Sequence, residues 1–117
     1  MVVKLADFGL RGLTHASLDA STLAFIAPEI LNKDPYHPKA DVYSFGTVLW
    51  VIAAQKLPYQ NLQHPRDIIA HVTSGRREII PRDCPGDLAS LIKQCWAQNP
   101  DERPDFSLIV RELQISQ

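Results

Sequence analysis

The side chains that most often carry chemistry fall into two kinds of pattern in this sequence. The histidines and cysteines, the usual transition-metal ligands, do not stand at ligand-like spacings, so no such site is predicted; they are His15, His37, His64, His71, Cys84 and Cys95. Acidic residues instead lie in short strings with glycine, proline or aromatic residues: Asp7-Phe8-Gly9, Ala27-Pro28-Glu29, Asp41 to Gly46 and Asn99 to Pro104. Each string alone is weak evidence, because a carboxylate beside glycine or proline is typical of an ordinary turn.

The chain before residue 39 is predicted to form a strand, a loop and a short helix. Residues 2–6 are rich in β-branched side chains and predict a strand. Residues 10–21 are small and polar and predict a long loop. Residues 27–32 have room for one or two helical turns, and two prolines within 33–38 interrupt the chain there.

A helix that is apolar on nearly every side is predicted over residues 41–54. Such a helix is normally buried, and about 14 residues are too few to cross a bilayer. Asp41 stands at its start, where a carboxylate can cap the helix or meet its dipole.

Three amphipathic helices are predicted in the rest of the chain. The first covers 66–74 and stops at Gly75; the second begins at Pro85 and places Cys95 on its apolar side; the third begins near Asp105. Arg76 and Arg77, between the first two, are expected to be a solvated surface pair. One strand followed by helices makes a mainly α chain.

Length and charge exclude several classes of protein. The 117 residues fit one domain or part of one, and 45% hydrophobic residues make disorder unlikely over most of the chain. Lys and Arg total 12 against 13 Asp and Glu, so no positive charge excess predicts nucleic-acid or membrane binding. Two cysteines cannot build a disulfide framework, which indicates a reducing compartment.

The four strings occur in an order that resembles the C-terminal lobe of a protein kinase, from the magnesium-binding loop to the final helix. The resemblance covers essentially the whole chain. It implies a protein kinase domain fragment over 1–117, with the magnesium-loop strand and activation segment at 1–32 and a helical subdomain at 33–117. The implied fold is partial and mainly α: a helical C-terminal lobe with one short N-terminal strand.

The resemblance is to the tyrosine-kinase-like group, near the receptor-interacting and mixed-lineage kinases. Trp96 and the Arg103-Pro104 ending are typical of this group and of tyrosine kinases. Residues 21–29 resemble the serine/threonine form and lack the proline that tyrosine kinases tend to carry, although Ser21 replaces a usual glycine and Phe25 a usual tyrosine or tryptophan. The implied activity of the intact parent is ATP-dependent phosphorylation of protein serine or threonine in signalling, with tyrosine as the alternative acceptor.

The resemblance assigns the nucleotide and metal contacts to Asp7, Phe8 and Gly9. Asp7 matches the aspartate that holds magnesium on the ATP phosphates, where a hard oxygen ligand is needed. Phe8 matches the residue whose packing separates active from inactive states. ATP and magnesium are therefore the implied cofactors of the parent.

Residues 10–26 match the activation and substrate-binding loops. Thr14, Ser17 and Ser21 are candidate phosphate acceptors, with an ordinary polar loop residue as the alternative for each. Thr22 matches the threonine that hydrogen-bonds the catalytic aspartate in serine/threonine kinases.

The remaining matched residues are structural. Glu29 and Arg103 match a buried ion pair that ties the substrate loop to the helical base, and we expect the two side chains to be in contact. Asp41 matches the residue that anchors the catalytic loop. Val48 and Ile52 lie on the face that supports an apolar column in the family, with plain core packing as the alternative.

Several kinase parts precede the position of Asp7 in the family: a glycine-rich loop, a lysine–glutamate pair and the catalytic loop. None occurs in this sequence, so no catalytic residue is assigned, and the chain alone is expected to lack phosphotransfer activity and to bind ATP–magnesium weakly. Two functions follow. The chain is part of a phosphotransferase, or it is a non-catalytic interaction module, pseudokinase-like or truncated, that offers its activation segment and helical base to partners.

The expected partners are protein substrates or signalling proteins in the cytoplasm, without nucleic acid or membrane insertion. Because a neighbouring helix of the family has no counterpart here, about five large apolar side chains of 41–54 are expected to face water or find a substitute cover. Burial of that size is comparable with the stability of a whole domain. The isolated chain is therefore expected to be molten, to self-associate through exposed apolar surface, or to need a partner.

Overall fold

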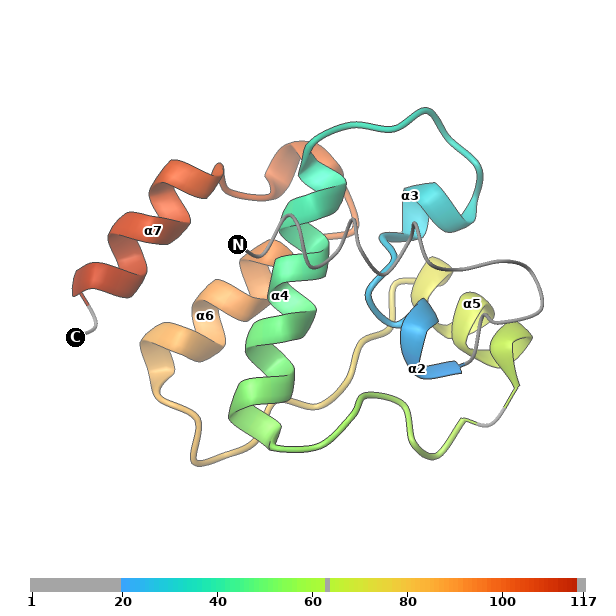
Figure 1. Cartoon of the computed structure of the whole chain (residues 1–117), viewed down its shortest axis with the longest axis horizontal. Helices are drawn as coiled ribbons and strands as arrows, with labels where there is room; N and C mark the ends of the chain where they lie inside the picture. The colour runs from blue at the N-terminus through green and yellow to red at the C-terminus, as the bar shows by residue number, and fades with distance from the viewer. Residues whose placement is uncertain (1–19, 63, 116–117) are drawn as a thin grey trace.

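A long buried helix, α4 (Lys39–Ala54), stands at the centre of the structure (Figure 1). The computed structural model describes residues 20–62 and 64–115 of the chain. The other elements in the described part are short helices: α2 (Ala20–Leu23), α3 (Pro28–Leu31), α5 (Pro65–Thr73), α6 (Gly86–Cys95), the 3-10 helix η1 (Pro100–Glu102) and α7 (Phe106–Ile115).

Helix α4 is buried because apolar side chains occur on nearly every side of it. Val42, Phe45, Leu49 and Trp50 are each at most 8% exposed. Ile52 is the one large apolar side chain of α4 that is exposed, at 63%. Most of the side chains that were expected to need a substitute cover therefore have one in this structure.

The remaining helices lie on two sides of α4. Helices α2 and α3 pack against α5 on one side, while α6 packs directly against α4 on the other (Figure 1). Gly46 permits the close approach of α6, because a Cβ built there would lie 2.7 Å from the Cβ of Cys95. Phe106 of α7 meets Phe45 of α4 edge-on, with ring centroids 5.9 Å apart.

The predicted helices are present, and their apolar stripes face the core. Ile68 and Val72 of α5, and Ile92 and Cys95 of α6, are completely buried. Gly75 follows α5 with a φ of 97°, the left-handed conformation that commonly ends a helix.

Two predictions of local structure need correction. Residues 20–23 were expected to belong to the loop and the substrate-binding segment. They form the short helix α2, which is stabilised by packing against α5. Asp41 does not cap α4, because the helix begins two residues earlier at Lys39 and has no side-chain cap. Asp41 lies in the first turn, where its carboxylate still meets the positive end of the helix dipole.

Helices dominate the described part of the chain, and no strand lies within 20–62 or 64–115. The strand predicted at 2–6 lies outside the described residues. None of the helices described is long and apolar enough to cross a membrane.

Candidate functional site

The guanidinium of Arg103 forms a two-pronged ion pair with the carboxylate of Glu29, as predicted. Its two terminal nitrogens donate to the two carboxylate oxygens at 2.7 and 2.8 Å. Glu29 lies in the first turn of α3, and Arg103 directly follows η1. The pair therefore connects segments that are 74 residues apart in sequence.

Arg103 is a buried cation that also donates to two main-chain carbonyls. Its side chain is 0% exposed, and that of Glu29 is 11% exposed. Nε donates to the carbonyl of Ala97 at 2.9 Å, and one terminal nitrogen also donates to the carbonyl of Lys39 at 3.0 Å. A charge is tolerated at this depth only when it is paired and hydrogen-bonded in this way.

The carboxyl of Glu29 is held in its charged form. Burial raises its pKa, but the hydrogen bonds and positive charge of Arg103 act in the opposite direction and leave the pKa below its usual value. The ion pair is therefore intact at neutral pH.

Two hydroxyls of α4 fix the segment that precedes Glu29. Ser44 Oγ donates to the carbonyl of Phe25 at 2.6 Å, and Thr47 Oγ1 donates to the carbonyl of Ala24 at 3.1 Å. Both α4 residues are buried. Main-chain carbonyls bonded to a buried helix have little freedom to move, so the approach to the Ala27-Pro28-Glu29 turn has a defined position.

Arg77 is half-buried and packs on an aromatic ring, which corrects the prediction of a solvated pair. Arg76 is exposed, but the guanidinium carbon of Arg77 lies 5.0 Å from the ring centroid of Tyr43, and that of Arg103 lies 5.2 Å from the same centroid. Arg77 also donates to the carbonyls of Trp96 and Val72, both at 3.1 Å. Cation–π contact and carbonyl acceptors together draw this side chain inward.

Tyr43, with these two cations nearby, has a strongly perturbed phenol. Burial raises its pKa to about 12, although the charges of Arg77 and Arg103 oppose the change. The ring is 1% exposed. Tyr43 is therefore neutral and acts as a packing surface for both guanidiniums.

The other predicted site residues are distributed as follows. Asp41 accepts a 2.6 Å hydrogen bond from the phenol of Tyr36. Trp96 is 5% exposed and donates from Nε1 to Thr47. Thr22 lies in α2 and is half-buried. Asp7, Phe8, Gly9, Thr14 and Ser17 lie outside the described residues, and the side chain of Ser21 is not described.

The described residues form one hydrogen-bonded platform around α4. The structure brings Glu29 and Arg103 together, and it connects Trp96 to the same platform through Thr47. Within 20–62 and 64–115, no group of three or more histidine, cysteine or acidic residues is arranged to hold a metal ion. What this part can do is hold the 22–29 segment in one conformation.

The contacts of Ser44, Thr47 and Arg77 were not predicted from the sequence. For the two hydroxyl residues a signal existed, because a polar side chain on an all-round buried helix must find a hydrogen-bond partner. For Arg77 the sequence gives no such signal. Its side chain donates to the carbonyls of residues 72 and 96, and the fold brings these carbonyls near it.

Comparison with known proteins gives consistent similarities. A family model described as protein tyrosine and serine/threonine kinase matches residues 1–113. The serine/threonine/tyrosine-protein kinase HT1 of Arabidopsis thaliana is 42% identical over 97% of this chain and 30% of its own length. A probable serine/threonine-protein kinase of Dictyostelium discoideum is 42% identical over 93% of the chain and 8% of its own. The serine/threonine-protein kinase STY46 of Arabidopsis thaliana is 37% identical over 97% of this chain and 20% of its own length. The chain thus spans less than a third of each relative.

Proposed function

The chain belongs to the protein tyrosine and serine/threonine kinase family, and we propose that it forms the substrate platform of a protein kinase domain. The complete enzyme would transfer the terminal phosphoryl group of ATP to serine or threonine of a protein substrate, with tyrosine as a further acceptor. The kinases HT1 and STY46 are named for these acceptor classes. We place this activity in the cytoplasm, in line with the two free cysteines.

The observation that carries the proposal is the fixed segment from Ala24 to Glu29. Its carbonyls bond to hydroxyls of α4, and its glutamate is held by Arg103 at two points. Phosphoryl transfer depends mainly on positioning and electrostatic stabilisation. A segment held by these bonds would supply the positioning of the acceptor hydroxyl.

The proposal assigns magnesium binding to Asp7, which lies outside the described residues. Magnesium on the ATP phosphates neutralises charge that develops during transfer. A carboxylate oxygen suits this hard cation. Thr14, Ser17 and Ser21 are proposed as sites at which the activation segment accepts phosphate, and Thr22 as a structural hydroxyl beside them.

The test is phosphoryl transfer from radiolabelled ATP to myelin basic protein by the complete kinase domain that contains this chain. Phosphoamino-acid analysis would identify the acceptor. We expect labelled phosphoserine or phosphothreonine, and Asp7→Asn should reduce the rate at least a hundredfold, on the order of the loss of one electrostatic contact in an active site.

Asp34→Asn is the matched control, because Asp34 is an exposed carboxylate in the loop after α3. It should leave the rate unchanged. Transfer that persists undiminished in Asp7→Asn, or no transfer by the wild-type domain, would contradict the proposed function.

A further inference from the structure

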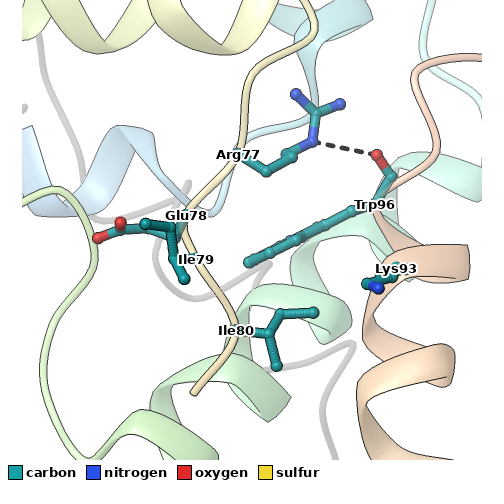
Figure 2. Close-up of a pocket in the computed structure, with 6 residues that line it drawn as sticks. All are labelled: Arg77, Glu78, Ile79, Ile80, Lys93 and Trp96. Atoms are coloured by element: carbon teal, nitrogen blue, oxygen red, sulfur yellow. Dashed lines mark hydrogen bonds between the residues drawn. The ribbon is translucent and has the colours of Figure 1, made fainter. Parts of the chain in front are cut away.

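A pocket of about 420 Å³ lies between the chain that follows α5 and helix α6 (Figure 2). It is separate from the Glu29–Arg103 pair. Its lining residues are Arg77, Glu78, Ile79, Ile80, Lys93 and Trp96. This volume is within the range of pockets that take a ligand or an inserted side chain.

The apolar wall of the pocket is held firmly in place. The indole of Trp96 is fixed by its hydrogen bond to Thr47, 3.0 Å long, and the carbonyl of Ile79 accepts a 3.0 Å bond from the indole of Trp50. The side chain of Ile79 is 85% exposed, while Ile80 is half-buried. A preformed apolar wall lowers the entropy lost when a guest binds.

Lys93 leaves an unneutralised charge at the pocket. Arg77 donates to neighbouring carbonyls and to the amide oxygen of Gln98, and Glu78 accepts a 2.7 Å bond from the main-chain N–H of Tyr59. Lys93 is exposed and forms no ion pair within the described part of the chain. The lining holds two cations and one carboxylate, so it favours an anionic guest.

The main chain beside the pocket has N–H donors that no acceptor within the described residues uses. Across residues 20–62 and 64–115, no acceptor is bonded to a main-chain N–H of residues 77–80. Figure 2 shows this stretch as a segment without helix or strand that passes along the pocket. Free N–H groups beside an apolar pocket are what an added peptide strand uses for affinity, while the pocket selects a side chain.

We propose that this pocket docks an extended peptide segment of a partner protein, with an aromatic or branched apolar side chain next to a carboxylate. The apolar side chain would lie against Trp96 and Ile80. The carboxylate would pair with Lys93, and peptide carbonyls would accept from the N–H groups of 77–80. This docking surface goes beyond the proposed phosphoryl transfer and does not depend on it.

The experiment uses NMR spectra of the full chain without ATP. The probe is the blocked peptide acetyl-Ala-Phe-Glu-Ala-amide, compared with versions that carry Gln or Lys in place of Glu, or Ala in place of Phe. We expect the first peptide to shift the Trp96 indole and Ile80 methyl signals and to slow hydrogen exchange at one or more N–H groups of 77–80. The Gln peptide should bind about two- to fivefold more weakly, as for loss of an exposed ion pair, and the Lys and Ala peptides more weakly still.

The variant Lys93→Glu should remove the preference for the Glu peptide, and Lys33→Glu is the matched control. Lys33 is exposed in the loop after α3, and it does not line the pocket. Equal binding of the Glu and Lys peptides, or no shift of the Trp96 indole, would overturn the proposal. The proposal would also be overturned if phenylacetate shifted the same signals as strongly as the peptide, because the pocket would then bind a small acid.

Discussion

Trp96, at the C-cap of α6, donates a 3.0 Å hydrogen bond from its indole to the hydroxyl of Thr47 on α4, and both residues are buried. The same hydroxyl donates to the carbonyl of Ala24, at 3.1 Å. One oxygen atom therefore connects α6 and α4 to the segment that leads to Glu29. A buried hydroxyl that both accepts and donates leaves no partner unsatisfied.

Replacing Thr47 by valine should destabilise the fold by about 1–3 kcal/mol, because valine keeps the shape but leaves the Trp96 indole and the Ala24 carbonyl without partners. The measurement is urea unfolding followed by circular dichroism. Thr47→Ser, which retains the hydroxyl, should lower the free energy of unfolding by less than Thr47→Val does. Equal losses for serine and valine would show that the methyl group matters and the hydrogen bonds do not.

The helices could be predicted from the sequence because their apolar residues recur at helical spacing. Helices α4, α5, α6 and α7 each begin within two residues of their predicted starts. The contact between Glu29 and Arg103 was also predictable, but only through resemblance to a family. Spacing alone does not relate residues that are 74 positions apart.

The rest depends on contacts that the fold creates. Helix α2 has four residues, too few to be stable without its packing on α5. Arg77 looks like a surface residue in sequence, yet Tyr43 and the carbonyl of Trp96 bring it inward. The sequence left open whether the apolar side chains of α4 would face water or find a substitute cover, because burial depends on neighbours that a helical pattern does not identify.

Replacing Arg103 by alanine should lower the free energy of unfolding by about 3–5 kcal/mol, as expected when a buried carboxylate loses its partner. Lysine at the same position should recover only part of this loss, because a single ammonium cannot reproduce the two-pronged pair and the bonds to two carbonyls. Thermal unfolding by calorimetry measures both.

Arg66→Ala is the control for this loss of an arginine, since Arg66 is exposed on α5. Its effect should stay within about 0.5 kcal/mol. If Arg103→Ala changed stability no more than Arg66→Ala, the ion pair would have no structural role.

The stability contributed by Glu29 should depend on pH in one direction. Its pKa is lower in the folded chain than the ordinary value of 4.5, because the bonds and charge of Arg103 outweigh the effect of burial. The charged carboxylate therefore stabilises the fold fully above about pH 5, and this contribution is lost as the pH falls through the folded pKa.

The measurement is the difference in unfolding free energy between wild type and Glu29→Gln from pH 3 to pH 7. The difference should be constant near neutral pH and shrink on acidification. Asp34→Asn, which removes an exposed carboxylate without an ion pair in the described part, is the matched variant. A Glu29 difference that grew on acidification would contradict the assigned sign.

Replacing Gly46 by alanine should destabilise the packing of α4 on α6. The added Cβ would lie 2.7 Å from the Cβ of Cys95 and 3.3 Å from the Trp96 ring, so the two helices must separate. Overpacking of this kind typically costs about 1–3 kcal/mol. Gly86 provides the matched control, because a Cβ there meets nothing within 4 Å at the start of α6, and Gly86→Ala should be neutral or slightly stabilising. Urea unfolding of both variants decides the matter: if Gly46→Ala proved as stable as Gly86→Ala, the close contact between the two helices would not be a constraint on the fold.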